Sequence, residues 1–254
     1  MALNRVIARL DIKKNRLIKG MHLEGWRFLP KPANEYCKHY YQNGIDEIIY
    51  IDVVASLYGR DALIDIIKES TNDVFVPITA GGGVKSVDDA WALLRAGADK
   101  VAVCSAAIKN PKLIEEIADR FGRQCMVLSI QAQKNETTKK YDAYYDIGRE
   151  NSGLDALEWM KEGVKLGAGE ILLTCINTEG TRKGYDLELI EAASKLVNVP
   201  LIASGGAGTM DHVSDAMKRG ANAAALAHAF HFNTIDIQDL KSHLREENIA
   251  VRKG

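Results

Sequence analysis

The chain alternates between short apolar runs rich in β-branched residues and longer stretches whose apolar residues recur with helical spacing. The short runs are typical of buried parallel strands, and the stretches between them are typical of amphipathic helices. We therefore expect eight strands, over residues 6–11, 47–52, 76–81, 100–104, 125–131, 170–177, 200–204 and 223–227.

Capping residues mark the predicted helices. Ser86, Asn110 and Asp186 stand where N-caps are expected, and glycine or asparagine stands near several helix ends. Strands that alternate with helices pair in parallel, so this order predicts an α/β protein with one (β/α)8 barrel domain over residues 1–254. An open doubly wound sheet is the alternative architecture.

An internal repeat supports the barrel. Residues 76–107 align without gaps on residues 199–230, through a strand, a loop, a helix and the next strand. The same offset pairs residues 44–48 with 167–171, and a slightly shorter one pairs the first predicted strand with the fifth. We expect two homologous half-barrels, about 1–122 and 123–254.

Composition narrows the possible functions. The 254 residues carry 33 Lys and Arg against 34 Asp and Glu, so we expect no large basic surface for nucleic acid or a membrane. No apolar run reaches transmembrane length and the opening lacks signal-peptide features, so we expect a cytoplasmic protein. Neither cysteines nor histidines have metal-ligand spacing. The four cysteines are expected to be reduced core thiols, and no metal or organic cofactor is predicted.

Two glycine-rich segments follow predicted strands. Gly81, Gly82 and Gly83 follow the third strand, and Gly205 and Gly206 follow the seventh. In a barrel the active site lies at the C-terminal ends of the strands, and bare backbone N–H groups there bind anions well. The pair predicts a small molecule with a phosphate at each end, although tight turns also explain such glycines.

Several segments carry a more specific signal: RVIARLDIK, LIKG, GIDEIIYIDVVAS, GGGVKS, GADKVAV, GAGEILLT, EGTRKGYD, IASGGAG and FHF. Together they resemble the cyclase subunit of imidazole glycerol phosphate synthase, the HisF family, over essentially the whole chain. The resemblance implies a (β/α)8 barrel docked on a HisH-like glutaminase. That partner hydrolyses glutamine and sends ammonia through the barrel to a phosphoribosyl substrate, where an imidazole ring closes.

The resemblance also implies two catalytic positions. The family uses aspartates at the ends of the first and fifth strands as general acid and base. Asp11 occupies the first position, but Gln131 occupies the second, and an amide cannot take part in acid–base work. Arg9, where the family usually has cysteine, shares a strand face with Asp11. We expect Arg9 to pair with Asp11 and to make it a poor proton donor.

Other positions at the predicted mouth match substrate-binding residues of the family. Cys104, Asn177 and His228 replace an asparagine, an aspartate and a serine, which predicts altered substrate recognition; neutral drift in a working cyclase is the alternative. The predicted phosphate- and substrate-binding residues are Lys19, Gly82, Gly83, Cys104, Ser105, Asn177, Glu179, Gly180, Gly205, Gly206 and His228.

The opposite end of the barrel matches the family's ammonia gate. Arg5, Glu47, Lys100 and Glu170 stand at the starts of predicted strands, where two cations and two anions can pair around a ring. Stabilising ion pairs alone are the alternative explanation. Asp99 matches a position that faces the glutaminase.

A complete gate and a broken acid–base pair favour a HisF-like subunit that conducts ammonia from a HisH-like glutaminase. The acceptor is then a sugar precursor of a surface polysaccharide, made into an amidino sugar with a sugar amidotransferase as a further partner, and cyclase activity of the chain alone is doubted. The main alternative is the authentic cyclase, a lyase of histidine biosynthesis. The sister isomerase of that pathway, which also needs an aspartate on the fifth strand, and a scaffold that only activates the glutaminase are less favoured.

Overall fold

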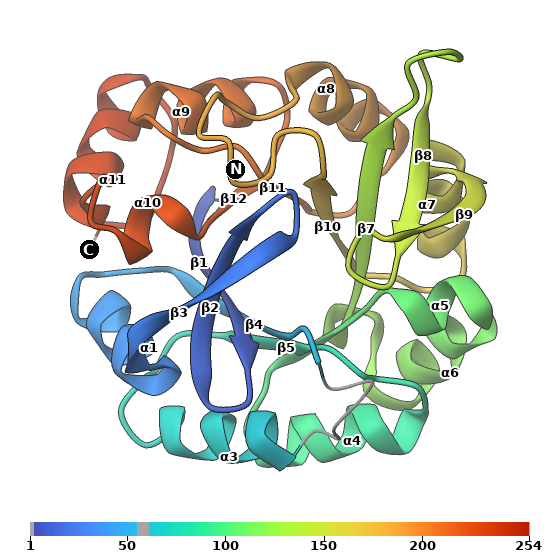
Figure 1. Ribbon diagram of the computed structural model, residues 1–254, viewed down its shortest axis with the longest axis horizontal. Coiled ribbons are helices and arrows are strands. Elements are labelled where there is room, and N and C mark those ends of the chain that lie inside the picture. Colours follow the sequence, from blue (N-terminus) through green and yellow to red (C-terminus); the bar gives the residue numbers. More distant parts are fainter. Residues whose placement is uncertain (1–2, 55–60, 254) are drawn as a thin grey trace.

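A closed barrel of eight parallel strands forms the centre of the molecule (Figure 1). The computed structural model describes residues 3–54 and 61–253, so Ala55 and Ser56 at the end of GIDEIIYIDVVAS lie outside the described residues. Around the barrel the strands are β1 (Arg5–Lys13), β4 (Glu47–Asp52), β5 (Ile78–Gly81), β6 (Lys100–Val103), β7 (Met126–Lys134), β10 (Glu170–Cys175), β11 (Leu201–Ser204) and β12 (Ala223–Leu226). Because β12 pairs with β1, the ring closes. The predicted barrel is confirmed, and the open sheet is wrong.

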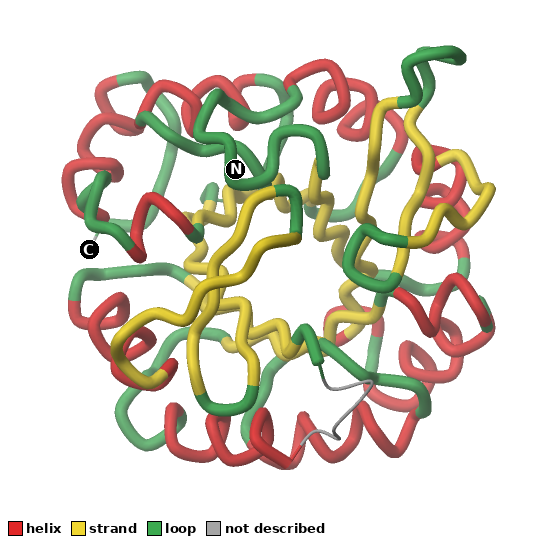
Figure 2. The backbone as a smooth tube through the Cα atoms, in the orientation of Figure 1, coloured by secondary structure: helices red, strands yellow, loops and turns green. Residues whose placement is uncertain are grey.

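Helices cover the outside of the barrel (Figure 2). They are α1 (Ala33–Gln42), α3 (Asp61–Ser70), α4 (Val87–Ala96), α6 (Lys112–Phe121), α7 (Ala156–Lys165), α8 (Leu187–Leu196), α9 (Met210–Lys218) and α11 (Ile237–Glu246), with the short α5 (Ser105–Lys109) and α10 (His228–His231) and a 3-10 turn, Arg123–Cys125. None of the helices in the described ranges is both long and apolar enough to span a membrane.

Two of the three predicted N-caps are confirmed. Ser86 and Asp186 accept backbone N–H groups in the first turns of α4 and α8. The prediction for Asn110 is wrong, because Pro111 directly precedes α6 and no side chain caps that helix. Proline replaces the cap here because its φ of −57° already suits a helix start.

Two antiparallel hairpins were not predicted. β2 (Arg16–Met21) pairs with β1 and with β3 (Glu24–Pro32), and this hairpin crosses the front of the barrel in Figure 1. β8 (Tyr141–Tyr145) pairs with β7 and with β9 (Glu150–Asp155). The guanidinium of Arg149 lies 5.7 Å from the ring centre of Trp26, so the two hairpins touch beside the barrel mouth.

In the part of the chain that the structure describes, apolar side chains form three buried clusters, of which the smallest joins Ile18 of β2 to Val53 and Val54 after β4. The larger core lies between the strands and the helices, and a smaller cluster fills the barrel interior. The interior cluster consists of Ile7, Ile49, Ala102, Val127, Leu172, Ile202, Ala223 and Ala225. An interior closed in this way leaves only the two ends of the barrel for polar chemistry.

The cysteines fit the sequence prediction in part. All four are free thiols, and Cys37 and Cys175 are buried as expected. Cys104 and Cys125 are only partly buried, so their prediction as core thiols is wrong. Cys104 comes after β6 and Cys125 before β7, and strand ends are less covered than strand centres.

Candidate functional site

A closed ring of ion pairs lies at the N-terminal ends of the strands. Arg5, Glu47, Lys100 and Glu170 are the first residues of β1, β4, β6 and β10. Arg5 pairs with Glu47 at 2.5 Å and with Glu170, and Lys100 pairs with the same two carboxylates at 3.0 and 2.7 Å. Each carboxylate meets both cations, so the ring carries no net charge. Asp99 lies beside it, exposed, and accepts the backbone N–H of Ile78.

Electrostatics favour the charged form of Arg5. Burial lowers the pKa of Arg5, but the carboxylates of Glu170 and Glu47 outweigh burial and raise the pKa above its ordinary value. The hydroxyl of Thr79 also donates to Glu47 at 2.9 Å. The end of the barrel is thus lined by paired charges, and the apolar cluster around Ile7 follows directly inside.

Arg9 crosses the barrel above the apolar cluster. Its Nε donates to Oδ1 of Asp11 at 2.9 Å, and its Nη1 donates to the hydroxyls of Thr174 at 2.9 Å and Ser204 at 3.0 Å. The guanidinium therefore connects β1 with β10 and β11, and Arg9 is only 6% exposed. The predicted pairing of Arg9 with Asp11 is confirmed.

Arg9 stays a cation in this buried position. Burial lowers the pKa of the Arg9 guanidinium, while the carboxylates of Asp11 and Glu179 raise it, and the net direction is upward. Loss of either carboxylate would leave the guanidinium less well compensated, which is costly for a buried charge.

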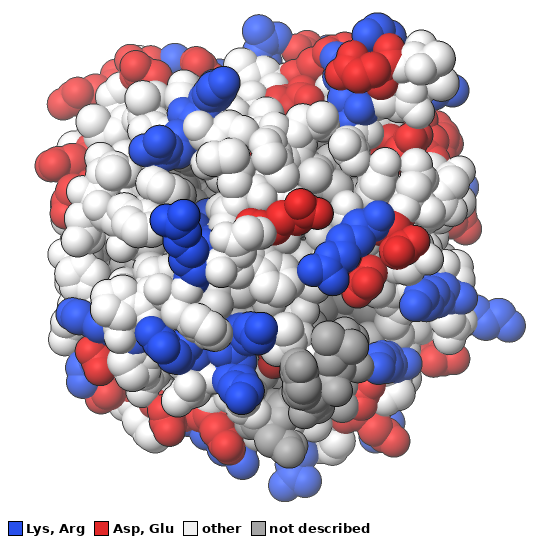
Figure 3. Space-filling view, in the orientation of Figure 1, with Lys and Arg blue, Asp and Glu red and all other residues white. Residues whose placement is uncertain are grey.

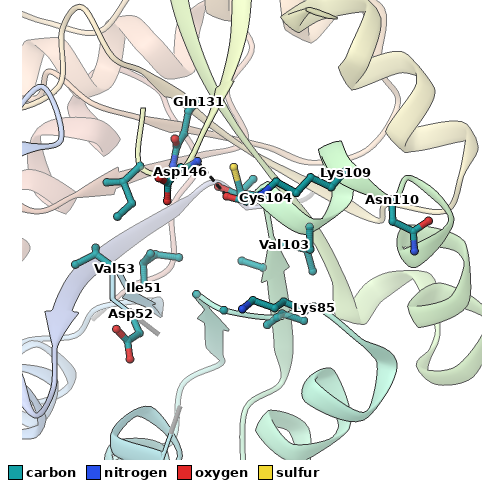
Figure 4. Close-up of a pocket in the computed structure, with 18 of the residues that line it drawn as sticks. Ile51, Asp52, Val53, Lys85, Val103, Cys104, Lys109, Asn110, Gln131 and Asp146 are labelled. Atoms are coloured by element: carbon teal, nitrogen blue, oxygen red, sulfur yellow. Dashed lines mark hydrogen bonds between the residues drawn. The ribbon is translucent and has the colours of Figure 1, made fainter. Parts of the chain in front are cut away.

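The larger cavity opens at the C-terminal ends of the strands and has a volume of about 420 Å³ (Figure 4). It brings together Gly82, Gly83, Cys104 and Ser105, which were predicted to bind substrate, with Gln131 at the predicted second catalytic position. A Cβ atom on Gly82 would lie 2.1 Å from a backbone oxygen, so only glycine fits this turn. Burial raises the pKa of the Cys104 thiol to about 12, although Arg9 opposes the rise, so this thiol is not a nucleophile at neutral pH.

Charged residues that sequence reasoning missed also line the larger cavity. Lys85 and Lys109 contribute cations, and Asp52 and Asp146 contribute anions. Lys85 stands inside the GGGVKS segment, which was a usable signal, whereas Asp146 is placed only by the β8–β9 hairpin. In Figure 4, Asp146 lies near Gln131 and Cys104, on the opposite side from Lys85.

The second glycine segment borders a much smaller cavity, of about 20 Å³. It is lined by all the remaining predicted phosphate- and substrate-binding residues except Asn177, namely Lys19, Glu179, Gly180, Gly205, Gly206 and His228. Lys19 forms a buried ion pair with Glu179, whose other oxygen accepts the backbone N–H of Leu23 at 3.1 Å. This space suits about one water molecule and is too small for a phosphate group.

His228 adds bulk but no fixed charge to this smaller cavity. Burial lowers the pKa of His228, and the nearby Arg182 and Lys19 lower it further. Its imidazole is therefore neutral at pH 7, and its ring packs on Phe232 with 4.5 Å between ring centres.

Two residues that were predicted at the barrel mouth lie outside both cavities. Asn177 is exposed, and its side-chain oxygen accepts the backbone N–H of Lys134 at 2.9 Å. Asp11 is 7% exposed and lies next to Arg9, and only Arg9 of this pair lines the cavities. Among the described residues, no group of three or more His, Cys, Asp or Glu side chains could hold a metal ion.

The fold and the site together define a class of protein. The chain is a (β/α)8 barrel with a neutral ion-pair ring at the N-terminal ends of its strands and two glycine-bordered cavities at the C-terminal ends, where barrel proteins carry their functional sites. Acidic and basic side chains are interspersed over the face in Figure 3, so neither sign of charge covers it as a whole.

Comparison with known proteins identifies the family. The family model described as "Histidine biosynthesis protein" matches residues 5–236. Proteins named imidazole glycerol phosphate synthase subunit HisF are similar: the Wolinella succinogenes protein is 47% identical, covering 98% of this chain and 97% of the relative. The Legionella pneumophila protein is 57% identical, covering 82% of this chain and 97% of the relative. The Bacillus cereus protein is 45% identical, covering 99% of this chain and 100% of the relative. The chain belongs to the HisF family.

Proposed function

We propose that the chain is the synthase subunit of an imidazole glycerol phosphate synthase of histidine biosynthesis and works with a HisH-like glutaminase. The complete ion-pair ring at the strand starts carries this proposal, because it matches the family's ammonia gate in a chain that is 45–57% identical to proteins named as HisF. The relatives thus favour the authentic cyclase over the sugar pathway that Gln131 and Arg9 suggested.

In this function, ammonia from glutamine enters at the ring and passes the apolar interior. Neutral ammonia suits that route, because the interior cluster offers no partner to a charged ammonium ion. One phosphate of the substrate is bound by Gly82, Gly83 and Ser105 with the cations Lys85 and Lys109 nearby. The other is bound at Gly205 and Gly206 once Lys19 leaves Glu179. Asp99 contributes to the glutaminase interface.

One observation favours a second candidate. Gln131 replaces the second aspartate of the family, and Asp11 is paired with Arg9 and does not itself line the larger cavity. A subunit without that acid–base pair can still conduct ammonia to a partner enzyme that amidates a sugar precursor. In this second candidate the chain closes no imidazole ring.

A direct assay decides between the two candidates. The purified chain is supplied with the ribulosyl carboxamide nucleotide substrate and an ammonium salt, and imidazole glycerol phosphate is measured. We expect turnover that depends on ammonium, with a reaction lacking ammonium as the blank. A folded chain, checked by circular dichroism, that forms no product would rule out the cyclase and favour the second candidate.

A further inference from the structure

The guanidinium of Arg9 has donors that no described residue uses. A guanidinium carries five N–H donors, one on Nε and two on each Nη. The bonds to Asp11, Thr174 and Ser204 occupy Nε and both donors of Nη1. Nη2 makes no hydrogen bond to any residue over 3–54 and 61–253, although Arg9 is only 6% exposed. Nη2 is not among the buried side-chain atoms that lack a partner, and Arg9 lines both cavities, so the unused donors face accessible space in which they can bind an oxygen atom.

The position of Arg9 indicates that this oxygen belongs to the substrate. Arg9 lines both the larger cavity with Gly82 and the smaller cavity with Gly206, so it lies where the middle of an elongated substrate would be. It is also the first polar side chain on β1 above Ile7 and the apolar interior. Under the proposed function, ammonia leaves the interior at this point.

We propose that Nη2 of Arg9 binds the carbonyl oxygen of the acceptor, at the carbon that ammonia attacks. The acceptor class is a phosphorylated compound with a ketone or similar carbonyl between its anionic ends. This inference rests on the proposed function for its nucleophile, while the oxygen-binding site at Arg9 rests on the geometry alone.

Arg9 stabilises charge in this step and transfers no proton. The lone pair of ammonia forms the new C–N bond, the C=O π bond breaks, and its electron pair moves onto oxygen. Nη2 donates to the resulting alkoxide and keeps its own protons. A proton then passes from the new ammonium nitrogen to the oxygen, and loss of water leaves an imine.

Arg9 is suited to this because it is preorganised. Bonds from Nε and Nη1 to three strands hold the guanidinium before substrate arrives, so little reorganisation accompanies the charge that develops on oxygen. Gln131, the neutral amide on the cavity wall, has no proton to supply. The fixed guanidinium of Arg9 therefore stabilises the negative charge on oxygen, which an acid would instead neutralise by proton transfer. Thr174 and Ser204 are positioning residues in this account.

Kinetics test the inference through Arg9→Gln and Arg9→Lys, with Arg120→Met on the outer face of α6 as the control for loss of an arginine charge. With ammonium salt and the ribulosyl substrate, we expect kcat to fall about a hundredfold to a thousandfold for Arg9→Gln, with a smaller change in KM. The kcat of Arg9→Lys should be intermediate, because one ammonium group cannot keep the hydrogen bonds to Asp11, Thr174 and Ser204.

A third variant, Arg9→Gly, tests for chemical rescue, and added guanidinium ion should partly restore its kcat. Unchanged kcat in folded Arg9→Gln would overturn the inference.

A binding measurement keeps the inference independent of turnover. In the wild-type protein with 15N-labelled arginine, formate serves as a one-carbon oxyanion probe. We expect the Arg9 side-chain resonances to shift saturably, and this response to weaken in the Thr174→Val, Ser204→Ala double variant. If the chain shows no turnover but Arg9 responds to formate as expected, the proposed function is contradicted and the oxygen-binding site is supported. Turnover with no response at Arg9 removes the oxygen site and leaves the proposed function.

Discussion

The side-chain oxygen of Gln131 accepts the backbone N–H of Gly148 at 2.6 Å. This bond joins the end of the fifth barrel strand to the loop between β8 and β9, beside the larger cavity. The residue at the family's second catalytic position is thus held in place, and what it lacks is a titratable proton. Its replacement is therefore a test of chemistry more than of folding.

Gln131→Asp should restore an acid–base group to the cavity wall. We expect ammonium-dependent turnover to rise by up to about a hundredfold, the lower end of what a positioned acid or base contributes. The matched control is Gln131→Asn, which has the size of aspartate without its charge. Equal rates for the two variants would show that proton transfer at residue 131 does not limit the reaction.

Lys100→Met should impair the passage of ammonia from the glutaminase into the barrel. It leaves Glu47 and Glu170 sharing Arg5 alone, so we expect a loss of about 3 kcal/mol in the free energy of unfolding. Glutamine-dependent turnover with the glutaminase should fall more than ammonium-dependent turnover. Lys165→Met, which removes an exposed ion pair, is the control and should change stability by less than about 1 kcal/mol. Equal loss of both activities would contradict a gate.

Glu179→Gln should open the smaller cavity to phosphate. The buried carboxylate now neutralises Lys19, and its removal leaves that ammonium without a counter-ion beside Gly205 and Gly206. We expect the affinity for inorganic phosphate, measured by calorimetry, to rise about tenfold, which corresponds to about 1.4 kcal/mol. Glu188→Gln, on an exposed ion pair with Lys134, should leave affinity unchanged. A Glu179→Gln variant with wild-type affinity would mean that Lys19 does not bind phosphate.

His231 should make the fold acid-sensitive. Burial is the main cause that lowers its pKa to about 3, and its Nδ1 lies 2.7 Å from the Tyr40 hydroxyl. Because the folded pKa lies below the unfolded value of about 6.5, the unfolded chain binds the extra proton as pH falls. The stability contribution is complete above about pH 6.5 and is lost progressively toward pH 3.

Denaturant titrations at two pH values check the effect of His231. Between about pH 7 and about pH 5, we expect wild type to lose about 2 kcal/mol more than His231→Gln does. The exposed His39 gives the control variant His39→Gln, which should follow wild type. Parallel curves for wild type and His231→Gln would mean that His231 takes up its proton in the folded state.

The local pattern of apolar and turn residues was enough to predict the barrel strands. Apolar runs bounded by turn residues placed all eight, including β4 at residues 47–52. The same pattern missed both hairpins, because β3 is mostly exposed and β9 has no buried residue, so neither shows the apolar signal of a buried strand. The two half-barrels stay a prediction from the internal repeat.

The amino-acid sequence by itself determined the barrel, because apolar runs and amphipathic stretches alternate along the whole chain. It also determined the four charged strand starts and the glycine turns, since each of these depends on residue types within one short segment. It also identified Gln131 and the Arg9–Asp11 pair, which are two residues apart on one strand face. Only the tertiary structure decided that Arg9 meets Thr174 and Ser204, which lie 165 and 195 residues away. Likewise, only barrel closure brings Lys19 to Glu179 and narrows the second cavity. Such contacts form between distant strands when the barrel closes, and no local periodicity encodes them.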